Sequence, residues 1–308
     1  MRNKEISVSI NESDQNDESQ QNNLAINKSI YIAGQFPKGK IKKIAYSNSS
    51  PIEILEKLFS IYMKQNPDYI EKLTGVEECH KYKLYACPKI NEDNVAPQKK
   101  VRIFTAKETS EGCQRFWCGS NREFNIALNC NLMIKGGRAE KKFLYLEKNF
   151  FCTCACCNRP FMDVYYCGVG ASNSGKGDFL GSIFNPCNCC KRECEIYLER
   201  SAGEGIPDFS IEGATCQTGI VCPCPCETCS FVYFNITNRD KGNIGKITKI
   251  FTSCAEEACS YNSNYVSNFP LKLKWKEKAM IIAAMLFTDY RLFNKRFYRS
   301  GGASKSGK

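Results

Sequence analysis

The sequence is nearly devoid of histidine, since His80 is the only one among 308 residues. Serine-protease triads, catalytic zinc sites with histidine ligands and most general-base enzymes depend on an imidazole. The scarcity of histidine therefore weighs against these enzyme classes.

Long apolar runs are scarce as well. The N-terminal stretch MRNKEISVSINESDQ has no apolar segment that could serve as a signal peptide, so we expect a protein that is not secreted. Near the C-terminus the apolar stretch Ala279–Phe287 would cover roughly half of a ~30 Å hydrocarbon core at ~1.5 Å per residue. Asp289 and Arg291 then interrupt it, which favours a buried helix over a membrane span.

Cysteine, in contrast, is abundant, with 21 residues. Because cytosolic thiols stay mostly reduced, lipid attachment and metal binding are favoured over disulfides. The densest cluster is the expected site of thioester lipidation, and its cysteines are Cys152, Cys154, Cys156 and Cys157. Buried small apolar side chains are the alternative. A second cluster has four thiols that could bind zinc, but its spacing contains only one CxxC step, so a zinc site there is the less favoured of its interpretations. Its cysteines are Cys222, Cys224, Cys226 and Cys229.

The net charge of +11 is concentrated near the C-terminus. Residues 272–308 hold ten Lys or Arg residues against Glu277 and Asp289, which gives +8 for this segment. We expect contacts with anionic lipid from the lysines before the apolar stretch, which are Lys272, Lys274, Lys276 and Lys278. We do not expect nucleic acid as a partner, because regularly interleaved stacking aromatics are missing around this charge.

Periodicity predicts a mainly β protein after a polar N-terminal tail. Residues 1–48 have a composition typical of disorder. Ser50 and Pro51 then predict a helix start in SSPIEILEKLFSIYMKQN, with Leu55, Leu58 and Tyr62 on one face. Twelve strands follow by alternation, in KYKLYAC, KVRIFTA, EFNIALN, NLMIK, KFLYLEK, PFMDVYYC, FLGSIF, CEIYLE, DFSIEG, FVYFNIT, IGKITKIF and FPLKLKW. Four cysteine-rich turns each lead into one of these strands.

The last predicted element is a helix over about 275–297, apolar nearly all round. Such a helix must be enclosed by protein or lipid. We therefore expect a closed twelve-stranded antiparallel barrel, over residues 49–299, around a central C-terminal helix, with 300–308 as a flexible tail. The residues expected in the barrel core are Met280, Ile281, Ile282, Met285, Leu286, Phe287 and Asp289.

From about Ile54 to Phe293 the chain resembles the phospholipid scramblases. The landmarks occur in order: LTGVEECHKYKL, FTAKETSEGCQRFWCGSNREFNI, CTCACC, IVCPCPCETCSFVYFNI, IGKITKIFTS, NFPLKLK and KAMIIAAMLFTDYRLF. The resemblance implies a tubby-like barrel and ATP-independent movement of phospholipids between leaflets. It also implies palmitate on the CTCACC cysteines and attachment to the cytosolic face of a membrane, most simply the plasma membrane. A membrane-tethered module that binds lipid or protein without transport is the alternative.

One segment departs from the family pattern. The family's acid-rich segment before the helix is taken to bind calcium, whereas here it reads YNSNYVSNFPLKLK. Its carboxylate positions are occupied by Tyr261, Ser263, Lys272 and Lys274. Because Ca²⁺ needs several oxygen ligands, we expect no calcium site and no other firm metal site there.

Overall fold

The protein is described by a computed structural model. The described residues are 50–66, 79–87, 100–118, 121–134, 137–152, 157–168, 176–188, 190–221, 229–240, 242–251, 264–270 and 272–293. The predicted tails 1–48 and 300–308 lie outside them.

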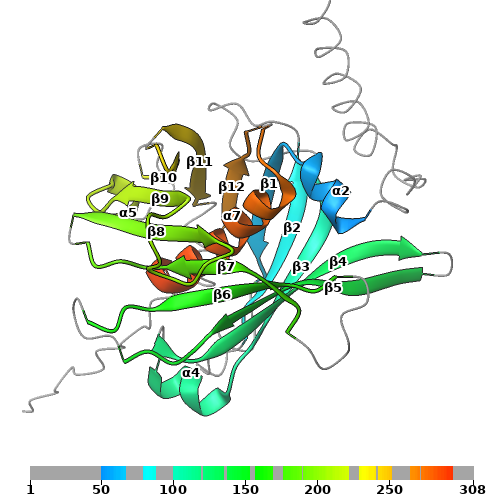
Figure 1. Ribbon diagram of the computed structural model, residues 1–308, viewed down its shortest axis with the longest axis horizontal. Helices are drawn as coiled ribbons and strands as arrows, with labels where there is room; N and C mark the ends of the chain where they lie inside the picture. The colour runs from blue at the N-terminus through cyan, green and yellow to red at the C-terminus, as the bar shows by residue number, and fades with distance from the viewer. Residues whose placement is uncertain are drawn as a thin grey trace, which may run out of the picture.

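Twelve antiparallel strands form a closed barrel, with each strand hydrogen-bonded to its neighbours in sequence and β1 paired with β12 (Figure 1). The strands are β1 Ser60–Gln65, β2 Lys81–Cys87, β3 Val101–Thr109, β4 Phe124–Ile134, β5 Gly137–Lys148, β6 Phe161–Tyr166, β7 Asp178–Phe184, β8 Lys191–Leu198, β9 Phe209–Ala214, β10 Phe231–Asn238, β11 Asn243–Ile250 and β12 Asn264–Asn268. Among the described residues, short helices precede or connect the strands, namely α2 Pro51–Glu56, α4 Gly112–Cys118 and α5 Thr218–Val221. The predicted fold class is confirmed.

Alternation along the strands separates the inside of the barrel from the outside. In β10, Val232, Phe234 and Ile236 are buried in the core, whereas Tyr233 and Asn235 between them are exposed. Since successive side chains of a strand point to opposite faces, this pattern places one apolar face of every such strand inside the ring.

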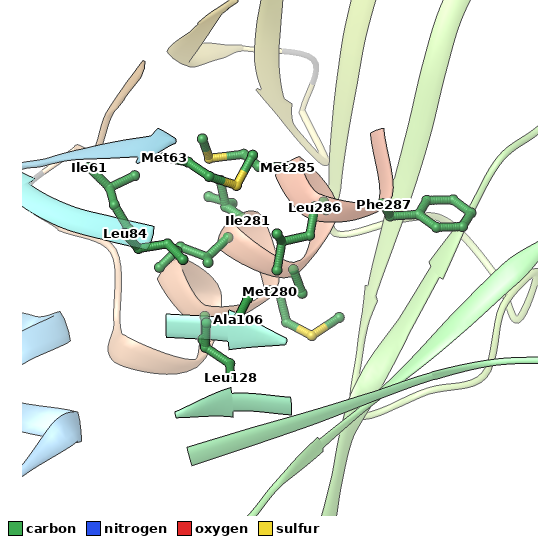
Figure 2. Packing of buried hydrophobic residues seen from close by; sticks show 14 of the residues in the cluster. Ile61, Met63, Leu84, Ala106, Leu128, Met280, Ile281, Met285, Leu286 and Phe287 are labelled. Carbon is green, nitrogen blue, oxygen red and sulfur yellow. The ribbon is translucent and has the colours of Figure 1, made fainter. Parts of the chain in front are cut away.

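The C-terminal helix fills that interior. It comprises α7, Trp275–Thr288, continued by the π-helical turn η2, Asp289–Phe293. Every residue from Lys278 to Tyr290 is buried, and the strands β1 to β4 direct Ile61, Leu84 and Leu128 toward it (Figure 2). The helix also contacts β7 and β8. Contacts on both sides of the ring explain why the helix has no polar face.

Several predicted elements were wrong in their details. The first helix starts as predicted, with Ser50 Oγ accepting a hydrogen bond from Glu53 N at 3.2 Å, but it ends at Glu56. Tyr62 belongs to β1, whose two faces are both buried, so that its alternation is hidden in the sequence. EFNIALN and NLMIK are parts of one strand, β4. FPLKLKW forms no strand in its described residues, because 264–268 already close the ring between β11 and β1.

Candidate functional site: the cysteine end of the barrel

The cysteine-rich connections lie at one end of the barrel. Neighbouring strands are antiparallel all round the ring, so the connections that lead into β2, β4, β6, β8, β10 and β12 share one end, which we call the cysteine end. It carries nine of the thirteen cysteines that the structure describes, namely Cys79, Cys113, Cys118, Cys152, Cys157, Cys187, Cys190, Cys216 and Cys229. All six cysteines classed as exposed are among these nine.

The β5–β6 connection holds the predicted lipidation sites. Cys152 and Cys157 are exposed, while Cys154 and Cys156 lie outside the described residues. Asn158 Nδ2 donates to the carbonyl of Cys152 at 3.2 Å, and Asn158 adopts φ 49°, a left-handed conformation that asparagine tolerates. The adjacent Phe150 is 50% exposed. This loop therefore presents two thiols and an apolar ring to the outside.

The remaining described cysteines are enclosed in the barrel wall. Burial raises the pKa of Cys87, Cys130 and Cys194 to about 12, and burial also raises the pKa of Cys167. A buried thiol with such a pKa stays protonated and is a poor nucleophile. Reactive thiol chemistry is thereby confined to the cysteine end among the residues that the structure describes.

The second predicted cysteine cluster is only partly described. Cys229 is half-buried, whereas Cys222, Cys224 and Cys226 lie outside the described residues, so the zinc reading stays a prediction. Within the described ranges, no group of three or more His, Cys, Asp or Glu side chains is placed to hold a metal ion.

Inside the cysteine end, the helix terminates in a cluster of buried polar groups. The Asp289 carboxylate accepts hydrogen bonds from the hydroxyls of Tyr82 in β2, at 2.9 Å, and Tyr265 in β12, at 2.7 Å. Burial, followed by the charge of Asp289, raises the pKa of Tyr82 well above its usual value, so this phenol stays a donor. The carboxylate that interrupts the apolar helix is thus satisfied within the protein.

A buried ion pair completes this inner polar cluster. Arg122 donates to Glu108 Oε1 at 2.9 Å, and both side chains are almost fully buried. Burial alone would raise the pKa of Glu108, but the charges of His80 and Arg122, together with hydrogen bonds from the His80 amide and the Ser110 hydroxyl, outweigh burial and hold the pKa low. Arg122 also lies 4.7 Å over the Tyr290 ring. Nothing in the spacing of Glu108 and Arg122 indicated this pair, because the turn between β3 and β4 brings them together.

Lys148 is the fourth charged member of the inner polar cluster. Its Nζ donates to the carbonyls of Asn121, Arg122 and Asn149 at 2.8–3.3 Å. Burial, reinforced by Arg291 and Arg122, lowers the pKa of Lys148 to about 7. These bonds join the end of β5 to the connection before β4.

The basic residues predicted to meet anionic lipid lie at the opposite end. Lys272 and Lys274 are exposed, and Lys276 pairs with Glu199 after β8. Lys278 is a correction: it is 1% exposed and donates to the carbonyls of Glu56 and Leu58 at 2.9 and 3.0 Å. Because its ammonium group donates to the end of α2, Lys278 connects α2 to α7 inside the protein and does not reach a headgroup.

The calcium segment is also only partly described, since Tyr261 and Ser263 lie outside. The two positions that are described present exposed ammonium groups, Lys272 and Lys274. Cations repel Ca²⁺ where the ion needs oxygen ligands, so these residues do not fit a calcium site.

Within the part of the chain that the structure describes, no helix has the length and apolar character needed to cross a bilayer. The 14 residues of α7 are enclosed by strands instead.

Comparisons with known proteins find relatives of similar sequence. Over 255 residues the chain is 25% identical to phospholipid scramblase 1 of Homo sapiens, which covers 79% of this chain and 65% of the relative. Phospholipid scramblase 2 of Homo sapiens is 24% identical over 257 residues, covering 79% of this chain and 70% of the relative. The match thus spans slightly less than two thirds of phospholipid scramblase 1, and no solved structure matches. Residues 40–295 match the Scramblase family model, and the chain belongs to that family.

Proposed function

We propose that the protein is a phospholipid scramblase that moves phospholipids in both directions between leaflets without ATP and without covalent catalysis. The family match over residues 40–295 is the observation that carries this proposal. A headgroup crossing hydrocarbon unaided must lose its hydration at high cost. A protein at the membrane lowers this barrier by offering polar contacts or by thinning the bilayer.

Membrane attachment is proposed to occur through palmitate on Cys152, Cys154, Cys156 and Cys157, on the cytosolic face of the plasma membrane. One acyl chain gives marginal binding, whereas two give stable anchoring. The exposure of Cys152, Cys157 and Phe150 supports this attachment. Calcium is not proposed as a ligand of residues 261–274, and calorimetric titration that detects micromolar Ca²⁺ binding there would contradict this.

The test is a liposome assay with fluorescent phospholipid in both leaflets and a membrane-impermeant quencher. Scrambling exposes the inner-leaflet label, so fluorescence falls well below the half that remains without protein. The acylated protein is compared with protein treated with hydroxylamine, which cleaves thioesters. If acylated protein binds the liposomes and leaves the inner label protected, the scrambling proposal fails.

That outcome would favour a second function, a membrane-tethered module that binds lipid or protein. The filled interior supports this alternative, because α7 occupies the space within the ring through which a lipid would otherwise pass. Binding without lipid exchange would select it.

A further inference from the structure

The exposed thiols lie at one end of the barrel, in the successive connections from β3–β4 to β9–β10. Cys113 lies between β3 and β4, Cys187 between β7 and β8, and Cys216 between β9 and β10, and all three are exposed. In a closed ring of twelve strands, the β3–β4 and β9–β10 connections are diametrically opposite. A flat membrane can meet Cys113 and Cys216 together only when the barrel stands on this end.

A second, independent feature at the same end is a strip of cations. Lys64, at the end of β1, lies directly opposite Lys83 of β2, and Lys81 opens β2. Like charges in directly opposed positions destabilise a sheet. Among the residues that the structure describes, none of these three lysines forms a salt bridge. Such a strip suits an anionic surface.

We propose that the cysteine end is one membrane-facing surface. In addition to the β5–β6 loop, Cys113, Cys187 and Cys216 carry acyl thioesters, the strip of Lys64, Lys81 and Lys83 meets anionic headgroups, and the barrel axis stands upright. The inference rests on the proposed membrane attachment and extends it to further sites and an orientation.

The chemistry of each added site is acyl transfer. The cysteine thiol loses its proton, and the thiolate sulfur attacks the carbonyl carbon of a long-chain acyl thioester donor. A new C–S bond forms, the donor's C–S bond breaks, and the released donor thiolate takes up a proton, without oxidation or reduction. The buried Cys167 and Cys194 cannot present their sulfur to such a donor.

Mass-tag acyl exchange on the full chain expressed in cells tests the added sites. A variant with Cys152, Cys154, Cys156 and Cys157 replaced by serine is expected to keep hydroxylamine-dependent tags. These tags should disappear when Cys113, Cys187 and Cys216 are replaced as well, together with Cys190, which is exposed in the same connection as Cys187. The control is S201C, which places an exposed thiol at the opposite end. Its thiol is expected to stay unmodified.

Three results would overturn the added sites. If all tags vanish with the β5–β6 cysteines alone, acylation is confined to that loop, while the proposed attachment survives. If S201C is tagged as well, acylation follows exposure and not this face. If the wild type carries no tag, the proposed attachment itself fails, and the inference fails with it.

Sedimentation with vesicles containing phosphatidylserine tests the orientation. K64Q and K83Q in the acylated protein are each expected to lower the partition coefficient about fivefold, equivalent to ~1 kcal/mol per lysine. K272Q and K274Q, at the opposite end, are the matched controls and should leave it unchanged. A loss of partitioning in the control pair alone would overturn the upright orientation. Equal loss with duplex DNA in place of vesicles would indicate a general polyanion surface and would also overturn it.

Discussion

The two ends of the barrel use charge in opposite ways. At the cysteine end the charged groups Glu108, Arg122, Lys148 and Asp289 are turned inward and buried beside the end of the helix. At the opposite end, ion pairs such as Arg200–Asp208 and Lys276–Glu199 lie near the surface. The cysteine end is therefore stabilised by buried polar contacts. Its outer loops are not needed for these contacts and can carry exposed thiols and apolar rings.

The difference indicates what each end can tolerate. Exposed ion pairs contribute little, so the pairs Arg200–Asp208 and Lys276–Glu199 at the opposite end should accept substitutions. The inner polar cluster consists of groups whose partners are all inside the protein, and removal of one partner leaves another buried without compensation. The following variants test this contrast.

The largest effect is expected when the buried ion pair is broken. R122M leaves the Glu108 carboxylate buried without its cation, and we expect unfolding free energy to fall by about 3–5 kcal/mol. Its counterpart R200M removes a partly exposed pair and should cost no more than about 1 kcal/mol. Urea denaturation of both variants measures the difference.

A second variant separates lost charge compensation from lost packing. Adding E108Q to R122M removes the unpaired carboxylate, so the double variant should be more stable than R122M alone. If R122M and R200M lose the same stability, the contrast between the two ends is incorrect.

A smaller effect is expected at the end of the helix. In D289N one of the two oxygens that accept bonds from Tyr82 and Tyr265 becomes an amide nitrogen. We expect a loss of about 1–3 kcal/mol, as for a buried group left without its partner. Y82F removes one donor and should fall in the same range. Thermal and urea unfolding that show D289N to be as stable as the wild type would mean that these bonds do not hold the helix.

The strand count illustrates how much of the fold could be predicted from the sequence. Twelve strands were predicted and twelve are present, yet β1 and β12 were missed, β4 was split and FPLKLKW was wrongly included. The errors cancelled in number. Ile61 and Met63 in β1 face the core while Tyr62 between them is also buried, so no polar residue marks the alternation.

The shared end of the cysteine loops could not be predicted for a related reason. Which end a connection occupies depends on the number of strands that precede it. If β4 were two strands, the loop containing Cys113 and the later cysteine loops would lie at opposite ends of the barrel. In the structure they lie at the same end. The all-round apolar helix, in contrast, was predictable, because enclosure is required for any helix without a polar face.

The smallest expected effect is a pH dependence of the unfolding free energy, caused by the buried Lys148. Lys148 has a pKa of about 7 in the folded protein, against about 10.4 in an unfolded chain. Between these values the unfolded chain holds a proton that the folded one lacks, so unfolding free energy rises with pH, by up to ~1.4 kcal/mol per pH unit. K148M removes this slope. The stability of the wild type minus that of K148M should therefore increase from pH 7 to pH 9.

The buried cysteines add a second pH dependence, which is the same in the wild type and in K148M. Above about pH 9 an unfolded chain loses thiol protons that Cys87, Cys130 and Cys194 retain, since their pKa is about 12 in the fold. This loss of protons lowers the unfolding free energy of the wild type and of K148M equally as pH rises. It therefore cancels when the stability of K148M is subtracted from that of the wild type. Urea titrations at intervals from pH 6 to pH 9 measure this difference in unfolding free energy. A difference that stays flat over this interval would show that Lys148 remains charged inside the barrel.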